Sequence, residues 1–346
     1  MNRDCISSLD YVRAFAIAMV VASHWGQGLG VGACGVLGGI ANCLFFVLSG
    51  LCLGIQWHSA GCPKYGIVFL RKRVARIYVP FVAFLGVYCI VLISFNGREG
   101  VMGNSVALNF LMLSWFAKLP GIGHLWFVTG MVMNYFVILG VSRNGNFLRK
   151  HALISILAAL FVCVTGQIIL SYCGVDQGYF LSMLLMSALA FAYGNRMMSC
   201  FVAQGRCRIW VLVVAGCFCV ISMLGIALNW RMMSAERTVF YWWCMLVAIV
   251  LIVFLASLKI RRTVSPISFI CAISYEVYLV HNPLCTPSPL FLKRLINNDF
   301  VYTVVFLSLS VMLGFALKRV IKSRVFDVVQ KYRLLHPLGH KQPSDN

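Results

Sequence analysis

Long apolar runs separated by short polar stretches dominate the chain. A helix needs about 20 apolar residues to cross the hydrocarbon core of a bilayer. Runs near that length cover residues 9–27, 35–56, 77–95, 124–142, 152–172, 179–195, 209–229, 239–258, 268–286 and 301–320. Segment 106–117 is apolar but too short to span, so it is expected to lie at the interface or to re-enter. The pattern predicts an all-α, polytopic membrane bundle of about ten spans over residues 1–321, then a polar cytoplasmic tail over 322–346.

The basic residues predict the orientation of these spans. Lys and Arg cluster after the second, fourth, sixth, eighth and tenth runs, and the intervening loops hold fewer of them. Cytoplasmic loops of membrane proteins carry an excess of Lys and Arg. Both termini are therefore expected on the cytoplasmic side, which agrees with an even number of spans.

Composition supports an integral, multi-pass protein of the cell or inner membrane. The chain has 346 residues, of which 61% are hydrophobic and only 11% are charged, whereas soluble domains are about 25% charged. The net charge of +20 comes from short basic clusters between apolar runs, so it indicates topology and not a nucleic-acid partner. The first run contains charges and lacks a small-residue cleavage site, so a retained helix is expected instead of a signal peptide.

The cysteines predict neither a metal site nor a disulfide framework. Most of the 15 cysteines lie inside apolar runs, and the chain has no Cys-x-x-Cys sequence. A thiol in such a run behaves as a small hydrophobic group.

The first run, LDYVRAFAIAMVVASHW from Leu9 to Trp25, carries the chemistry that the rest of the pattern lacks. An ionisable side chain inside a spanning helix is costly, so it is a candidate functional residue. Arg13 and His24 are eleven residues apart, which places them on one helix face about 16 Å apart along the axis. Asp10 precedes Arg13 by three residues, within reach of an ion pair that lowers the cost of burying both.

Further histidines fall at the depth of His24 on other predicted helices. His124 opens the fourth span in GHLWFVTG, and His281 lies near the outer end of the ninth in ISYEVYLVHNP, three residues after Tyr278. Helix ends at the membrane interface also tolerate His and aromatic residues without any function. Both readings stay open for these positions.

Arginines collect at the opposite depth. Arg73 and Arg76 are three residues apart on the turn leading into the third span, so on a helix they present two guanidinium groups to one place. Arginine suits bidentate recognition of phosphate, although cytoplasmic charge that sets topology is the alternative. In FFVLSG, from Phe45 to Gly50, Ser49 and Gly50 would allow close backbone approach or passage of a slender ligand.

At these residues the chain resembles the acyltransferase-3 family, integral-membrane acyltransferases that modify surface polysaccharides and other glycans. The resemblance covers residues 9 to about 320 and rests on five sequences in the family's order. They are LDYVRAFAIAMVVASHW with Arg13-x10-His24, FFVLSG, RKRVARIYVP with Arg73 and Arg76, HLWFV from His124, and ISYEVYLVH ending at His281.

This resemblance implies an O-acetyltransferase with an acyl-CoA donor, usually acetyl-CoA, used from the cytoplasmic side and no tightly bound cofactor. The acceptor would be a hydroxyl of a carbohydrate or a lipid-linked glycan. Some larger family members carry a fused extracytoplasmic esterase-like domain that this chain lacks, so it is expected to complete the transfer itself or with a separate partner.

The resemblance and the depth of the polar residues together suggest roles. His24 would be the general base, with transient acylation of His24 as a variant. Arg13, oriented by Asp10, would neutralise donor charge or stabilise the thioester oxyanion. Arg73 and Arg76 would hold the donor's anionic nucleotide.

The acceptor side and one rival function complete the prediction. His124, His281 and Tyr278 would bind acceptor hydroxyls. The rival from another class is a flippase or exporter of a lipid-linked sugar, but the internal repeats and midplane helix breaks common in transporters are not found in the sequence.

Overall fold

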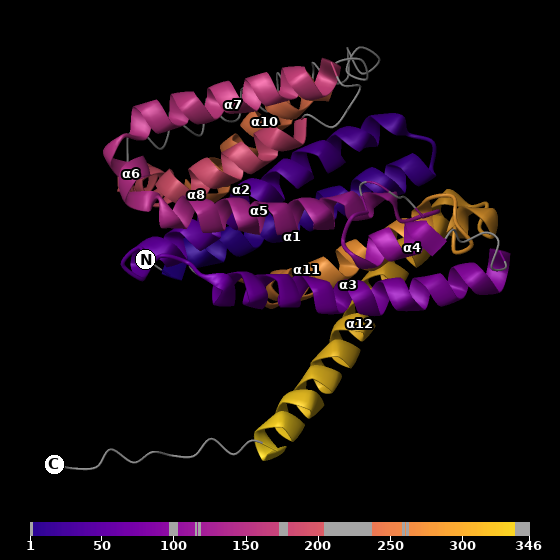
Figure 1. Cartoon of the computed structure of the whole chain (residues 1–346). Helices are drawn as coiled ribbons and strands as arrows, with labels where there is room; N and C mark the ends of the chain where they lie inside the picture. Colours follow the sequence, from indigo (N-terminus) through magenta and orange to yellow (C-terminus); the bar gives the residue numbers. More distant parts are fainter. Residues whose placement is uncertain are drawn as a thin grey trace.

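The structure, a computed structural model, describes residues 3–96, 103–114, 116, 119–172, 179–203, 237–257, 260 and 263–335. Within these residues all regular secondary structure is helical (Figure 1). The long helices are α1 (Arg3–Gly28), α2 (Gly35–Ser59), α3 (Ile67–Asn96), α5 (Trp126–Arg143), α7 (Ala152–Tyr172), α8 (Tyr179–Ala203), α10 (Arg237–Ser257), α11 (Ser265–Cys285) and α12 (Asp299–Leu335). Shorter elements are α4 (Gly103–Phe110), α6 (Gly145–Lys150) and the 3-10 turns η1 (Gly32–Cys34), η2 (Gly123–Leu125) and η3 (Leu292–Arg294).

The all-α prediction is confirmed for the described residues. Each predicted span coincides with one of these long helices except 209–229, which lies outside the described residues. Five segments of the described chain are long and apolar enough to cross a membrane: Gly32–Ser59, Ile67–Phe95, Gly123–Arg143, Ala152–Ile169 and Asp299–Lys322. The total of ten spans and the cytoplasmic position of both termini stay predictions.

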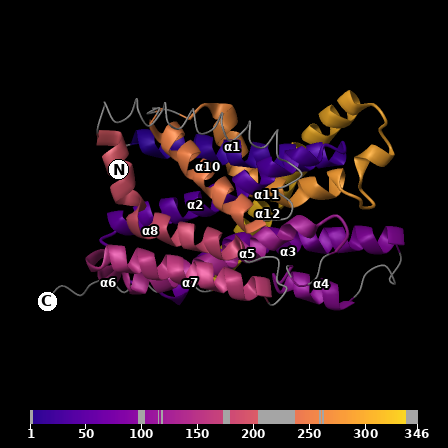
Figure 2. The ribbon, with the colours of Figure 1, turned by 90° about the horizontal axis from the view of Figure 1, so that it is seen from above.

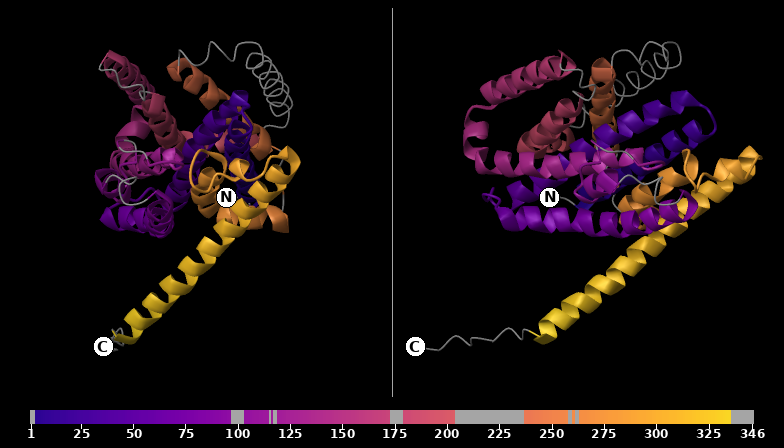
Figure 3. Two further views of the ribbon diagram at one scale, coloured as in Figure 1. Left: turned by 90° about the vertical axis from the view of Figure 1, so that its right-hand side faces the viewer. Right: turned by 45° about the vertical axis from the view of Figure 1, so that its right-hand side comes forward.

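Two helices are longer than the apolar runs that predict them. α3 begins at Ile67, so the basic cluster that includes Arg73 and Arg76 lies on the helix and not on a turn before it. α12 continues to Leu335, so much of the segment expected as a polar tail is helical. The C-terminal part of α12 projects away from the bundle (Figure 3).

Helix α1 lies in the middle of the assembly. It packs against α2, α10 and α11. Figure 1 shows it near the centre of the bundle, and Figure 2 shows α10 beside it. In Figure 1, α7 lies along the upper edge of the bundle and α3 along the lower edge. One side of α1 therefore packs against other helices, whereas Phe15 on α1 is 45% exposed.

Glycines on α2 set how closely α8 approaches. A Cβ added at Gly50 would lie 2.0 Å from the Ser187 carbonyl oxygen, and one at Gly54 would lie 2.3 Å from the Phe191 carbonyl oxygen. This spacing of two small residues four apart is common where membrane helices pack backbone to backbone. The close approach expected at Gly50 is present.

Candidate active site

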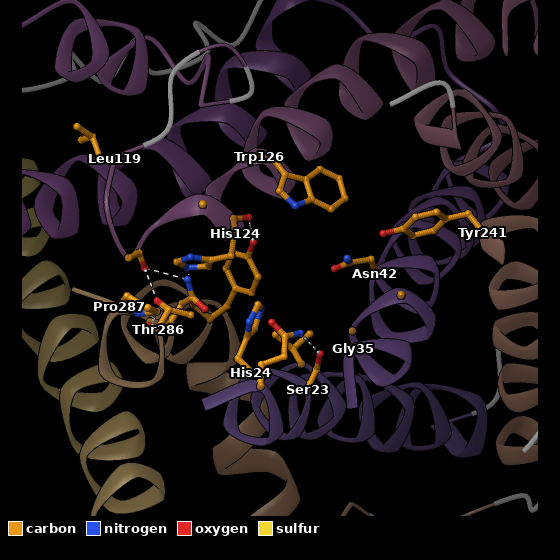
Figure 4. Close-up of a pocket in the computed structure, with 18 residues that line it drawn as sticks. Ser23, His24, Gly35, Asn42, Leu119, His124, Trp126, Tyr241, Thr286 and Pro287 are labelled. Atoms are coloured by element: carbon orange, nitrogen blue, oxygen red, sulfur yellow. Dashed lines mark hydrogen bonds between the residues drawn. The ribbon is translucent and has the colours of Figure 1, made fainter. Parts of the chain in front are cut away.

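One cavity within the described residues is lined by two of the sequence-predicted histidines, His24 and His124. It has a volume of about 500 Å³, and we call it the histidine cavity. Its polar and aromatic lining residues are Ser23, His24, Gln27, Asn42, His124, Trp126, Tyr241, Tyr278, Asn282 and Thr286. In Figure 4, His24 and His124 lie together on one side of the space, and Asn42 and Tyr241 lie across from them.

Three imidazoles from three helical elements meet beside this cavity. The ring centroid of His24 lies 5.1 Å from that of His281 and 6.2 Å from that of His124, and the rings of His124 and His281 are 5.3 Å apart. The sequence placed these residues at one depth, and the structure brings them into contact. Among the described residues, no group of three or more His, Cys, Asp and Glu side chains is arranged to hold a metal ion.

A well-anchored loop positions His124. Tyr88 donates a hydrogen bond to the Pro120 carbonyl at 2.7 Å, and Asn282 donates through Nδ2 to the Gly121 carbonyl at 2.8 Å. Gly121 has φ +72°, a left-handed conformation that favours glycine. The turn it makes leads directly into η2, which carries His124.

One backbone carbonyl holds two of the imidazoles. The Tyr278 carbonyl oxygen accepts a hydrogen bond from His124 Nε2 at 3.0 Å and from His281 Nδ1 at 2.8 Å. A carbonyl oxygen only accepts, so both nitrogens must carry hydrogen. The other nitrogen of each ring is then an unprotonated acceptor while the ring is neutral. The Tyr278 hydroxyl in turn donates to the His124 carbonyl, which ties α11 to η2 in both directions.

A second, larger cavity of about 940 Å³ collects the arginines. We call it the arginine cavity, and its basic lining residues are Arg13, Lys72, Arg73, Arg76, Lys318 and Lys322. Arg73 donates to Gln56 Oε1 at 3.2 Å and lies over the ring of Phe69, 5.6 Å from its centroid. Cations from α1, α3 and α12 thus converge on one hollow that suits a polyanionic ligand.

The two cavities share Tyr278 as a lining residue. Its side chain is buried, and its ring lies 5.3 Å from that of Phe127, which also lines the arginine cavity. Helix α1 contributes to both spaces, with Arg13 in the arginine cavity and His24 in the histidine cavity. A slender molecule extending from one cavity to the other would pass Tyr278.

Comparison with protein families gives the family of the chain. The acyltransferase-3 model, described as an acyltransferase domain, matches residues 6–319. The chain belongs to the acyltransferase-3 family. Comparison with curated proteins and with solved structures found no match. The protein is thus a membrane acyltransferase, and both cavities lie within the part of the chain that the family model covers.

The Asp10–Arg13 pair of this acyltransferase exists but is loose. Arg13 Nη1 lies 3.4 Å from Asp10 Oδ1, and both side chains keep about a third of their surface exposed, at 37% and 30%. Asp10 Oδ2 also accepts a hydrogen bond from Thr263 at 3.4 Å. Asp10 does not line either cavity, so its contact with the site runs through Arg13.

The structure separates the residues expected to bind the acceptor. His124 and Tyr278 line the histidine cavity, but His281 does not, and its side chain is fully buried with 0% exposed. The predicted nucleotide-binding residues Arg73 and Arg76 both line the arginine cavity.

Sequence reasoning missed several lining residues of the acyltransferase. Asn42 on α2 faces the histidine cavity, and Lys72, Lys318 and Lys322 face the arginine cavity. Asn42 could have been found, because an amide inside an apolar span carries the same signal as a buried charge. The lysines look like topology-setting charges in sequence, and that pattern gives no sign of their convergence.

Proposed function

We propose that the protein transfers an acetyl group from acetyl-CoA to a hydroxyl of a cell-surface or lipid-linked carbohydrate, with His24 as general base. The observation that carries this proposal is that one helix, α1, contributes a cation to the arginine cavity and an imidazole to the histidine cavity. The two cavities then take the two substrates, and the acyl group moves past Tyr278 between them.

The arginine cavity suits the donor. The nucleotide of an acyl-CoA carries several phosphate charges, and Arg73, Arg76 and Lys318 line the space from two helices. Guanidinium groups bind phosphate oxygens in pairs. The long, thin pantetheine arm would then extend along α1 over the rise of about 16 Å between Arg13 and His24. In this proposal the arginine cavity would lie on the cytoplasmic side, the side that the basic loops predict for the donor.

The histidine cavity suits an uncharged sugar. None of its described lining residues is Asp, Glu, Lys or Arg. Amide and hydroxyl side chains such as Asn42 and Thr286 can bond sugar hydroxyls, and Trp126 offers an aromatic surface of the kind that packs on apolar sugar faces.

The proposed reaction needs one proton acceptor at the hydroxyl. His24 takes the proton of the attacking hydroxyl as its oxygen forms a bond to the thioester carbon. The carbon–sulfur bond then breaks, and His24 returns the proton to the departing thiolate. Direct attack explains transfer with one base, and transient acylation of His24 is the variant with a covalent intermediate.

The position of Arg13 favours one of its two expected roles. Arg13 lines the arginine cavity, about three turns of α1 away from His24. A thioester whose carbonyl lies at His24 is too far from Arg13 for a direct hydrogen bond. Arg13 would therefore neutralise donor charge and not stabilise the oxyanion.

The test uses membranes that contain the wild-type chain, His24→Ala or the control His151→Ala. His151 lies in neither cavity, and its ring lies beside Phe147. The membranes receive radiolabelled acetyl-CoA and a fraction of glycan or lipid-linked sugar, and insertion and folding of each variant are checked by size-exclusion chromatography. Label in the glycan is expected with wild type and His151→Ala and is expected to fall at least a hundredfold with His24→Ala.

Two results would contradict the proposal in different ways. Equal labelling with His24→Ala would remove His24 as the base while leaving the transfer intact. Absence of label with wild type, together with movement of labelled sugar across the membrane, would support the flippase or exporter.

A further inference from the structure

We propose that His281 is a positioning residue that accepts a hydrogen bond from His24 Nδ1–H and so presents His24 Nε2 as the base. The inference rests on the proposed role of His24 as the proton acceptor. It assigns His281 a different task from the one expected from sequence, which was to bind the acceptor.

The hydrogen bonds of His281 determine which of its ring nitrogens carries the hydrogen. Its Nδ1 donates to the Tyr278 carbonyl at 2.8 Å and lies 3.2 Å from the Val277 carbonyl, and both oxygens only accept. Nδ1 therefore carries the hydrogen, and Nε2 of the neutral ring is a bare acceptor. That Nε2 is buried and has no hydrogen-bond partner among the residues that the structure describes.

The bare His281 Nε2 lies near His24 and away from the histidine cavity. His281 has 0% of its surface exposed and does not line the histidine cavity, so a sugar in that cavity does not contact it. The ring of His24 lies 5.1 Å away between centroids, tilted by 52°. His24 Nδ1 is also buried and also lacks a partner. Each of the three clustered rings thus has one buried nitrogen without a partner among the described residues, and those of His24 and His281 lie one on each side of the α1–α11 contact.

The bare His281 Nε2 favours one tautomer of His24. Two bare lone pairs brought together repel, whereas an N–H facing a lone pair forms a hydrogen bond. His24 is therefore expected to carry its hydrogen on Nδ1 when it turns toward His281. Nε2 of His24 is then unprotonated, and since His24 lines the cavity, this nitrogen is the one available to a hydroxyl there.

The transferred proton is taken up and released by His24 alone. When His24 Nε2 takes the hydroxyl proton, the ring becomes an imidazolium, and Nδ1–H donates a stronger, charge-assisted hydrogen bond to His281 Nε2. The proton on Nε2 goes to the thiolate when the carbon–sulfur bond breaks, so His281 neither gains nor loses a proton. A turn of the His24 ring closes the bond, as catalytic hydrogen bonds often tighten only with substrate bound.

His124 is less suited to this task. Its ring lies 6.2 Å from His24, farther than His281, and it lines the cavity where the acceptor would lie. Its Nε2 donates to the same Tyr278 carbonyl, so its bare Nδ1 remains an acceptor. The shorter ring separation therefore favours His281 over His124 as the partner of His24.

The main experiment measures steady-state transfer by full-length protein in membranes for His281→Leu, His281→Asn and His281→Gln. Gln has an oxygen that reaches the position of Nε2, Asn is too short to reach it, and Leu has no polar atom. We expect Leu and Asn to lower kcat about a hundredfold, with KM for both substrates within threefold of wild type. The kcat of His281→Gln is expected to be at least tenfold higher than that of the Leu and Asn variants.

A second measurement does not depend on acetyl transfer. Diethylpyrocarbonate modifies unprotonated imidazole nitrogens, and mass spectrometry reports the rate at each histidine. In wild type we expect modification of His24 and none of His281 on the same time scale. His281→Leu should slow modification of His24 at least fivefold, and His281→Gln should restore it. This result would hold even if the substrates of the proposed function were wrong.

Three outcomes would overturn the inference. A raised KM for the acceptor with unchanged kcat would return His281 to substrate binding. Equal losses in the Leu, Asn and Gln variants would make its role one of packing. Modification of wild-type His281 as fast as His24 would show that it faces the cavity.

Discussion

The turn at Gly121 gives a prediction whose size can be worked from the structure. Gly121→Ala places a side chain on a residue with φ +72°, and the left-handed conformation costs an L-residue about 1–2 kcal/mol. The new Cβ would also lie 2.6 Å from Tyr88 Oη and 2.6 Å from Ser288 Cβ. Tyr88 is held by the Pro120 carbonyl, so it cannot turn away without losing that bond. Such overpacking costs about 1–3 kcal/mol.

The sum predicts that Gly121→Ala lowers the free energy of unfolding by roughly 2–5 kcal/mol. The measurement is unfolding of the purified protein in mixed detergent micelles with increasing dodecyl sulfate, followed by tryptophan fluorescence. Because the Gly121 carbonyl accepts from Asn282, which lines the histidine cavity, the variant that stays folded should also bind the acceptor more weakly.

Gly123→Ala is the matched control for this prediction. It lies two residues along the chain, and a Cβ there would have no heavy atom within 4 Å. We expect its unfolding free energy to stay within about 0.5 kcal/mol of wild type. A Gly121→Ala protein as stable as this control would refute the reasoning, because it would show that the turn relaxes without cost.

Three further predictions concern the donor side and the helix contacts. Arg73→Ala should raise KM for acetyl-CoA about tenfold to a hundredfold, because it removes a hydrogen bond to a charged group. The control Arg71→Ala, outside the arginine cavity, should leave this KM within about twofold of wild type. Asp10→Asn should lower kcat/KM less than tenfold, because its ion pair is long and partly exposed; a larger loss would give Asp10 a direct role. Gly54→Ala should destabilise the protein by about 1–3 kcal/mol in the same unfolding assay, since its Cβ would meet the Phe191 carbonyl. Equal stability of Gly54→Ala and the open-space control Gly140→Ala would contradict this.

The features that sequence predicted well are local. Span length and the eleven-residue separation of Arg13 and His24 depend on helix geometry within one element, and α1 places these residues in two cavities along its length. The apolar run over 77–95 predicted only the apolar part of α3. The helix itself begins earlier, at Ile67, because the basic residues are good helix formers.

The role of α11 could not be predicted in the same way. Residues 276–285 of this helix are all buried, so no polar face distinguishes the cavity side from the packed side. His281 and Asn282 are adjacent in sequence and differ by about 100° around the axis. Asn282 lines the cavity while His281 packs behind it. Packing against the neighbouring helices determines which of the two side chains faces the cavity.

The lysines of α12 show the same limit over a longer range. Lys318 and Lys322 reach the arginine cavity because α12 packs on α11, far along the chain from Arg73 and Arg76. Such convergence depends on tertiary packing and leaves no mark in local spacing.

Helix α1 has a consequence for donors of different size. One helix carries both Arg13 and His24, so in the proposed reaction a donor held at the Arg13 end would bring its thioester to His24 as an intramolecular event. A short thioester that lacks the nucleotide and much of the arm can occupy the His24 end but gains nothing from the cations. It must then reach the base from bulk solution, at a concentration far below the effective molarity that tethering provides. If acyl-CoA is the donor, as proposed, the length of α1 between these two residues would therefore favour full-length donors through a higher rate of transfer.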